Sequence, residues 1–190
     1  MASVRYCRQR VNVNRARAIR FGIAVAVLVA AGLLSAAAFA TAHAEKSLPT
    51  LNREVLGAVN KFRVAHGLVP LRQSAGLDRS ARQHSLEMGR FGYFAHPSHD
   101  GTAFWRRIRH YYSARGRSYW AVGENLLWAS PSVSAGNAMQ MWIASPEHLR
   151  NLLTKQWRGI GISAVSVAHA PGVFNGQPVT IITTDFGVRR

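Results

Sequence analysis

The chain has 190 residues, 48% of them hydrophobic, with a formal net charge of +16 and one cysteine. This length suits one domain of ordinary size, and the hydrophobic fraction excludes intrinsic disorder for most of it. A single cysteine excludes an intramolecular disulfide framework, a four-cysteine zinc site and a Cys-x-x-Cys redox pair. The excess of 24 basic over eight acidic residues suits nucleic acid, an anionic cell-surface polymer or a membrane, depending on where the charge lies.

Residues 1–44 have the plan of an export signal. Residues 1–20 contain six arginines and no acid, and residues 21–42 contain no charge. The tripeptide Ala42-His43-Ala44 offers the small residues that a signal peptidase requires, so we predict a Sec-type signal peptide cleaved before Glu45. The alternative is an uncleaved membrane anchor, because about 20 apolar residues can span a bilayer. Cleavage leaves residues 45–190 as a single domain with 18 basic and eight acidic residues, a net charge of +10, and no cysteine.

The first half of this domain is predicted to be helical. Apolar residues at helical spacing indicate helices over about 51–66 and 77–91, with Thr50 as the N-cap of the first and Gly92 closing the second. A loop over 96–101 precedes a third amphipathic helix from Phe104 to about 112.

Strands dominate the last part of the chain. A short strand is predicted over 120–127, followed by a helix that Ser132 or Ser134 caps and a further helix from Pro146 to Leu153. Two β-branched runs at 159–167 and 179–186, joined by a turn over 170–177, indicate a hairpin. Helices first and strands late predict an α+β fold, with helices on both sides of a small sheet.

Most catalytic signatures are absent from the sequence. It has no glycine-rich phosphate loop, no Gly-x-Ser-x-Gly elbow, no His-Glu-x-x-His helix, and no cysteine after residue 44, which excludes nucleotide-dependent and thiol chemistry of those kinds. The remaining candidates are histidines and scarce carboxylates.

Two histidines stand in positions that suit a cleft. His96 follows the second helix, and Asp100, four residues on, is placed to orient its ring. His148 opens the Pro146 helix, with Asn151 placed to brace the ring or the neighbouring loop. Taken alone, each is also compatible with an ordinary surface histidine. His84, on the apolar face of the second helix, is interpreted as a hydrogen-bonded core residue.

Glu124 is the acid that most needs a partner. It lies between Gly123 and Asn125 at the start of an apolar run, and an unpaired buried carboxylate is costly, so we expect a cationic or metallic partner. Two histidines and one carboxylate suffice for zinc with an open water position. Such a trio also arises by chance in many proteins of this size.

The third helix carries Arg106, Arg107 and Arg109 among aromatic residues. This pattern suits contact with a polyanion through charge and stacking. The alternative is an amphipathic helix with a solvated arginine face, which the spacing of Phe104 and Ile108 favours. An export signal argues against nucleic acid as the partner.

Read in order, several motifs resemble the CAP superfamily (the cysteine-rich secretory, antigen-five and pathogenesis-related proteins, or SCP domain), most closely its bacterial secreted branch. The matching stretches are Leu51-Asn52, Phe62-Arg63, Gly67-Leu68-Val69-Pro70-Leu71, Ala81-Arg82-Gln83-His84-Ser85, Tyr93-Phe94-Ala95-His96, Asp100-Gly101, Gly123-Glu124-Asn125, Ser145-Pro146-Glu147-His148, Gly159-Ile160-Gly161 and Thr184-Asp185-Phe186-Gly187. The resemblance covers nearly all of residues 45–190. It implies a three-layer α-β-α sandwich around a small, mainly antiparallel sheet.

The resemblance also implies that His96, Glu124 and His148 meet in a central cleft able to hold zinc or another divalent cation. The family's second glutamate falls at Ser145 here, so the obvious second general base is missing. Ser145 or Glu147 is expected to contribute in its place. Asp100, Asn125 and Asn151 are expected around the same cleft.

These features favour a secreted, non-catalytic domain that binds zinc and a cell-envelope polymer, a lipid or another extracellular protein. A membrane is a partner only if the N-terminal segment stays uncleaved. The alternative is a zinc-assisted hydrolase of peptide or cell-wall bonds, with Glu124 as ligand or general base.

Overall fold

The computed structural model describes residues 45–190, so the predicted signal peptide lies outside the described residues. The elements follow the chain in the order β1 (Glu45–Ser47), α1 (Pro49–Ala65), β2 (Arg72–Gln73), α2 (Ala75–Phe91), α3 (Phe104–Tyr111), β3 (Trp120–Ala129), α4 (Ala135–Ala144), α5 (Pro146–Leu153), β4 (Gly159–Val167), a 3-10 turn η1 (Gly172–Phe174) and β5 (Val179–Arg189). No helix within residues 45–190 is long and apolar enough to cross a membrane.

The strands form one sheet in the order β1-β4-β5-β3, with β2 attached to β4. All pairings are antiparallel except the two-residue β2–β4 pair. The predicted hairpin is β4 and β5, and two strands extend beyond their predicted ends, to Ala129 and Arg189. Strands β1 and β2 were not predicted, because segments of two or three residues carry no alternation and form only by pairing with β4.

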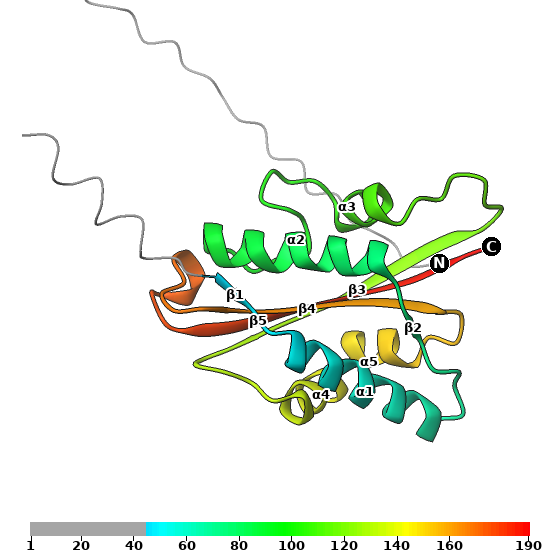
Figure 1. The fold of residues 1–190 in the computed structure, drawn as a ribbon, viewed down its shortest axis with the longest axis horizontal. Coiled ribbons are helices and arrows are strands. Elements are labelled where there is room, and N and C mark those ends of the chain that lie inside the picture. Colours follow the sequence, from blue (N-terminus) through cyan, green and yellow to red (C-terminus); the bar gives the residue numbers. More distant parts are fainter. Residues whose placement is uncertain (1–44) are drawn as a thin grey trace, which may run out of the picture. The chain divides into compact units, whose positions relative to one another are not determined.

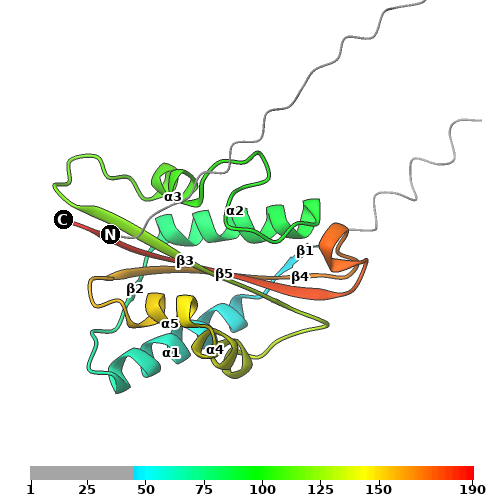
Figure 2. The ribbon, with the colours of Figure 1, turned by 180° about the vertical axis from the view of Figure 1, so that it is seen from behind.

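Helices cover both faces of this sheet (Figures 1 and 2): α2 and α3 lie on one face, and α1, α4 and α5 lie on the other. The predicted α+β sandwich with a mainly antiparallel sheet is confirmed. The apolar core is correspondingly divided. One buried cluster, which includes Val59, Trp142 and Ile182, lies under α1, α4 and α5, and two smaller clusters around Met88 and Ile108 lie under α2 and α3.

Local sequence sets most helix ends. Gly92 ends α2 in the left-handed conformation, with φ of 67°, which a glycine adopts without steric cost. Ser134 caps α4, its hydroxyl oxygen accepting a hydrogen bond from the Asn137 amide at 3.2 Å. The predicted cap at Thr50 is wrong: α1 begins at Pro49 after Leu48, because proline suits the first helical position.

One row of the sheet lies directly beneath α2. Glu124 on β3 is opposite Asp185 on β5, which is opposite Gly161 on β4. A Cβ at Gly161 would lie 2.0 Å from the Leu77 carbonyl carbon of α2, so only glycine permits this close approach. The result is a pair of neighbouring carboxylates on strands that α2 and α3 cover.

Candidate functional site

The centre of the candidate site is Glu124, whose side chain is 1% exposed. It shares a face of β3 with Leu126, which belongs to the buried cluster of Met88 in α2, because side chains two residues apart on a strand point the same way. Its Oε1 accepts a hydrogen bond from His96 Nδ1 at 2.8 Å, and its Oε2 accepts one from Arg107 Nη2. The expected partner of Glu124 is therefore cationic.

These contacts keep Glu124 ionised. Burial alone would raise the pKa of its carboxyl group, but the hydrogen bond from His96 and the charge of Arg107 lower the pKa below its ordinary value. A buried carboxylate held by an arginine and a histidine is a satisfied anion. Both of its oxygens are occupied.

Arg107 corrects the prediction for α3. We grouped it with Arg106 and Arg109 as a surface contact for polyanions, but its side chain is only 2% exposed, whereas the other two are exposed. The signal was present in the sequence: Arg107 is three residues after Phe104 and adjacent to Ile108, on the stripe that faces the sheet. Its Nη1 donates to the His96 carbonyl at 3.2 Å, so Arg107 fixes both Glu124 and the loop that carries His96.

The loop between α2 and α3 presents His96. Ser98 anchors it, with its amide donating to the Thr102 carbonyl at 2.8 Å and its hydroxyl accepting from Arg107 at 3.0 Å. Asp100 does not orient the histidine as predicted. Its Oδ1 accepts from the Thr102 amide at 2.8 Å, a local turn bond that lowers the pKa of the Asp100 carboxyl group.

His96 is oriented by Glu124 instead, and half of its side chain is exposed. Because an ionised carboxylate only accepts hydrogen bonds, the shared proton sits on Nδ1 of the imidazole. In the neutral imidazole the other nitrogen, Nε2, carries a lone pair that a ligand or a metal ion can use.

His148 reaches the site from the opposite side of β3. Asn151 Nδ2 donates to the Glu124 carbonyl at 3.0 Å and to Asn125 Oδ1 at 2.9 Å, and Asn125 Nδ2 donates to the His148 carbonyl at 3.1 Å. These bonds tie α5 to β3 next to Glu124, so Asn151 braces the strand rather than the imidazole ring. Partial burial, followed by the nearby His96, lowers the pKa of His148.

Ser145 and Glu147 have smaller parts in the site. Ser145 precedes Pro146 as the N-cap of α5, and its side chain makes no capping bond. Glu147 is exposed in the first turn, where its charge opposes the lowering of the His148 pKa. Neither side chain takes the place of the second glutamate that the family resemblance implies at position 145.

His84 is the core histidine that the sequence predicted. It is fully buried, and its Nε2 donates to the Ala95 carbonyl at 2.9 Å, 4.0 Å from Glu124 Oε1. Burial lowers the pKa of His84 to about 4, so the ring is neutral at pH 7. It packs behind Glu124 without adding charge.

Asp185 is a buried acid that the sequence analysis missed as part of the site. Its side chain is fully buried beside Glu124 and close to the Ser80 hydroxyl. Burial and the negative charge of Glu124 raise the pKa of Asp185 well above its ordinary value. A charged residue inside a β-branched strand was the available signal.

The three predicted metal ligands do not form a metal centre in this arrangement. Within residues 45–190 no group of three or more His, Cys, Asp or Glu side chains is arranged to hold a metal ion. Glu124 is the member that does not fit, because Arg107 already occupies one of its oxygens and His96 the other. The two imidazoles remain, with Glu124 behind His96.

Comparisons with known proteins agree with this architecture. The family model described as the cysteine-rich secretory protein family (CAP) matches residues 56–177. Over 125 residues the chain is 28% identical to the uncharacterized protein YkwD of Bacillus subtilis (strain 168), an alignment that covers 66% of this chain and 46% of that protein.

Two solved bacterial structures share the fold. An extracellular protein containing an SCP domain from Bacillus anthracis str. Ames superposes with a TM-score of 0.58 at 24% identity, covering 75% of this chain and 41% of that one. An outer surface protein from Borrelia burgdorferi superposes with a TM-score of 0.59 at 16% identity, covering 76% and 98%. The chain thus spans less than half the length of the two Bacillus proteins.

Proposed function

Because the chain belongs to the cysteine-rich secretory protein (CAP) family, we propose that it is an exported binding domain without catalytic activity, whose surface beside His96 and His148 takes a cell-envelope ligand. Export is supported by the basic and apolar pattern of residues 1–44 and by similar proteins described as extracellular and outer surface. The ligand classes that fit are an envelope polymer, a lipid and another extracellular protein.

The state of Glu124 is the observation that carries this proposal. A general base needs a carboxylate oxygen free to take a proton from substrate or water. Both Glu124 oxygens are occupied, and the carboxylate is 1% exposed. Glu124 therefore acts by holding His96 and Arg107 in place.

For metal binding, the proposal is a divalent cation, zinc first, held by His96 Nε2 and His148. Glu124 then supports the cation indirectly, as the carboxylate that orients its histidine ligand. Two protein ligands leave the remaining coordination positions to water or to the envelope ligand.

Calorimetric titration of the purified full-length chain with zinc tests this metal site. We expect binding that is abolished in the His96→Ala/His148→Ala double variant and retained in His169→Ala, a matched variant of an exposed histidine elsewhere. Glu124→Gln is expected to weaken binding about tenfold rather than abolish it, because it removes an outer-shell partner. Equal zinc affinity in the double variant and the wild type would refute the site.

Polyanion contact remains in the proposal only for Arg106 and Arg109, which are exposed. Arg107 is excluded because it is buried against Glu124. Exposed arginines of this kind contribute to encounter with an anionic envelope through long-range charge.

The second candidate, a metal-assisted hydrolase of peptide or cell-wall bonds, is favoured by one observation. His96 has its Nδ1 held by a carboxylate, an arrangement that also leaves Nε2 ready to act as a base. Incubation with purified peptidoglycan decides between the candidates. We expect no turnover; turnover that a chelator and His96→Ala both remove would establish the hydrolase instead.

A further inference from the structure

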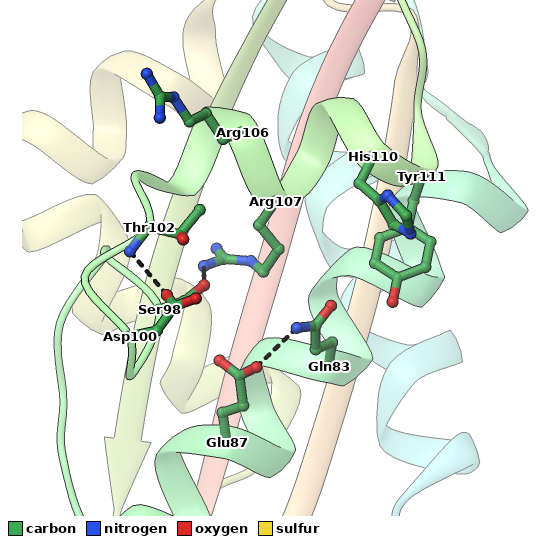
Figure 3. Close-up of a pocket in the computed structure, with 9 residues that line it drawn as sticks. All are labelled: Gln83, Glu87, Ser98, Asp100, Thr102, Arg106, Arg107, His110 and Tyr111. Carbon is green, nitrogen blue, oxygen red and sulfur yellow. Dashed lines mark hydrogen bonds between the residues drawn. The ribbon is translucent and has the colours of Figure 1, made fainter.

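A polar pocket of about 310 Å³ lies between α2, α3 and the loop that joins them (Figure 3). Its volume is at the small end of the range for ligand sites. Arg107, which holds Glu124, also lines this pocket and extends across its middle toward Ser98. The pocket is therefore connected to the candidate site through one buried side chain.

The α3 side of the pocket offers hydrogen-bond donors. Arg107 Nε is buried and has no acceptor within residues 45–190, although the other guanidinium nitrogens are bonded to Glu124, Ser98 and the His96 carbonyl. That nitrogen is closed to solvent, so the donors that a ligand can reach on this side of the pocket are those of the exposed Arg106 and His110.

The α2 side offers hydrogen-bond acceptors. Glu87 accepts from Gln83 Nε2 at 2.7 Å through Oε1 and from the Tyr93 hydroxyl at 3.3 Å through Oε2. A carboxylate has about four acceptor positions, and Glu87, unlike the buried Glu124, is partly exposed, so it can still accept from a ligand donor. Figure 3 shows Glu87 and Gln83 projecting from α2 on the side opposite Arg107. A ligand bound here must both donate and accept hydrogen bonds.

A second pocket of about 540 Å³ continues this one along α2. The two share Gln83, Glu87 and Tyr111, and the second adds three exposed arginines of α2, namely Arg79, Arg82 and Arg90. We name these two adjoining pockets together the α2 groove. Two adjoining pockets suit a ligand of linked units better than one small molecule.

The α2 groove contains charges of both signs. Arg79, Arg82 and Arg90 line it together with the carboxylates of Glu45 and Glu87. A polymer with an anion on every unit, such as a phosphodiester chain, would place some of its charges against these acids at a repulsive cost. A polymer with neutral units between its anions avoids that cost.

We propose that the α2 groove binds a polysaccharide that carries carboxylate groups at intervals. Sugar hydroxyls both donate and accept, as the α3 and α2 sides require, and the Tyr111 ring offers an apolar surface for a sugar face. The arginines of α2 pair with the carboxylates, for which guanidinium geometry is suited. The inference rests on the proposed function only in taking the ligand from outside the cell, because the groove and the surface beside His96 and His148 have different lining residues.

Titration of the purified full-length chain with a hyaluronan hexasaccharide, in which neutral and carboxylated sugars alternate, tests the proposal. We expect binding in the submillimolar range, weakened at least tenfold by Arg82→Ala and by Glu87→Gln. The matched variants Arg53→Ala and Glu54→Gln change exposed residues of α1, on the other side of the sheet, and are expected to leave affinity unchanged.

Two further ligands make the outcome decisive. A neutral dextran hexamer is expected to bind at least tenfold more weakly, and a heparin hexasaccharide not more tightly than hyaluronan. Heparin binding that exceeds hyaluronan binding and falls equally in Arg53→Ala would show unspecific charge attraction and overturn the proposal. Failure of all three to bind at millimolar concentration, or unchanged affinity in Arg82→Ala and Glu87→Gln, would overturn it as well.

The His96→Ala/His148→Ala variant separates this inference from the proposed function. Zinc binding lost with hyaluronan binding retained supports both sites. Loss of hyaluronan binding in this variant would instead assign the sugar to the surface beside His96 and His148 and refute the α2 groove. Zinc binding unaffected by the double variant refutes only the metal site.

Discussion

Two arginines are buried on opposite faces of the sheet, and their guanidinium groups donate to different kinds of acceptor. Arg107, under α3, is paired with the Glu124 carboxylate. Arg63 of α1 is fully buried without an acid, and it donates to three carbonyls, those of Val69 at 3.1 Å, Leu152 at 2.7 Å and Thr154 at 3.1 Å.

The difference distinguishes an arginine that stabilises the fold from an arginine that belongs to the candidate site. The Leu152 and Thr154 carbonyls lie at the C-terminal end of α5, where the helix dipole is negative and cations are stabilising. Arg63 therefore joins α1 to α5 from a position that no ligand reaches. Arg107 instead joins Glu124 to the half-exposed His96. A buried arginine alone therefore does not indicate a functional site. The indication comes from its partner, here a carboxylate that also contacts an exposed histidine.

Removal of the Arg107 charge tests the paired side of this comparison and has the largest expected effect. In Arg107→Met, Glu124 would remain buried beside Asp185 without its counter-charge, so we expect a loss of about 4 kcal/mol in unfolding free energy. Urea denaturation measures it, with Arg109→Met as the exposed control.

The double variant Arg107→Met/Glu124→Gln checks the cause. It removes both charges, so its loss is expected to be smaller than that of Arg107→Met alone. A double variant that loses the sum of the two single effects would contradict the ion-pair account.

Acidification is expected to lower the stability of the fold through His84, which lies on the same side of the sheet as Arg107. Its pKa falls from 6.5 in the unfolded chain to about 4 in the fold, so between these values the unfolded chain binds the extra proton. Stability is therefore complete above pH 6.5 and is lost progressively down to pH 4, by about 3 kcal/mol. Urea denaturation at pH 7.5 and 4.5 measures the loss, and His84→Gln is expected to reduce the difference. An unchanged difference in His84→Gln would assign it to other groups.

On the carbonyl-bonded side, Arg63→Met is expected to cost about 2 kcal/mol, because it leaves buried carbonyls without donors but no unpaired charge. Arg63→Lys is expected to recover part of that loss by restoring a donor and the charge. If Arg63→Met proved more destabilising than Arg107→Met in the same urea assay, the distinction between the two arginines would be wrong.

The smallest expected effect is at Asp185, whose pKa the charge of Arg107 lowers by less than burial and Glu124 raise it. Its raised pKa means that the fold favours the protonated acid, so its stabilising contribution is lost as pH rises. Asp185→Asn mimics the protonated form and is expected to stabilise the protein by about 1 kcal/mol at pH 8. The gain is expected to shrink at pH 5. A loss of stability at pH 8 would show that the wild-type carboxylate is ionised and stabilises the fold.

Sequence patterns predicted the parts of this fold that are locally encoded. Helical spacing, the glycine at 92, the cap at Ser134 and the β-branched hairpin all appear where expected. Strands β1 and β2 escaped prediction because only their pairing with β4 defines them.

The sequence predicted which residues belong to the site better than it predicted the hydrogen bonds between them. Glu124 was expected to need a cation, but the choice of Arg107 depends on how α3 packs over β3, which lies beyond local spacing. The assignment of Asp100 to His96 failed because a turn bond to the amide two residues on competes better than a contact across the loop. Such competition is decided by three-dimensional geometry.

The adjacent residues Glu124 and Asn125 lie on an edge strand and point to opposite faces of the sheet. One is tied to α3 and His96, and the other to α5 and the backbone of His148. The imidazole of His96 and the backbone of His148 are thus held by two adjacent residues of one strand. A slip of β3 by one residue would exchange the acid and the amide and disconnect both helices together. Variation of ligand preference in this protein must therefore come from the loops and exposed helix faces around β3, while the strand itself stays fixed.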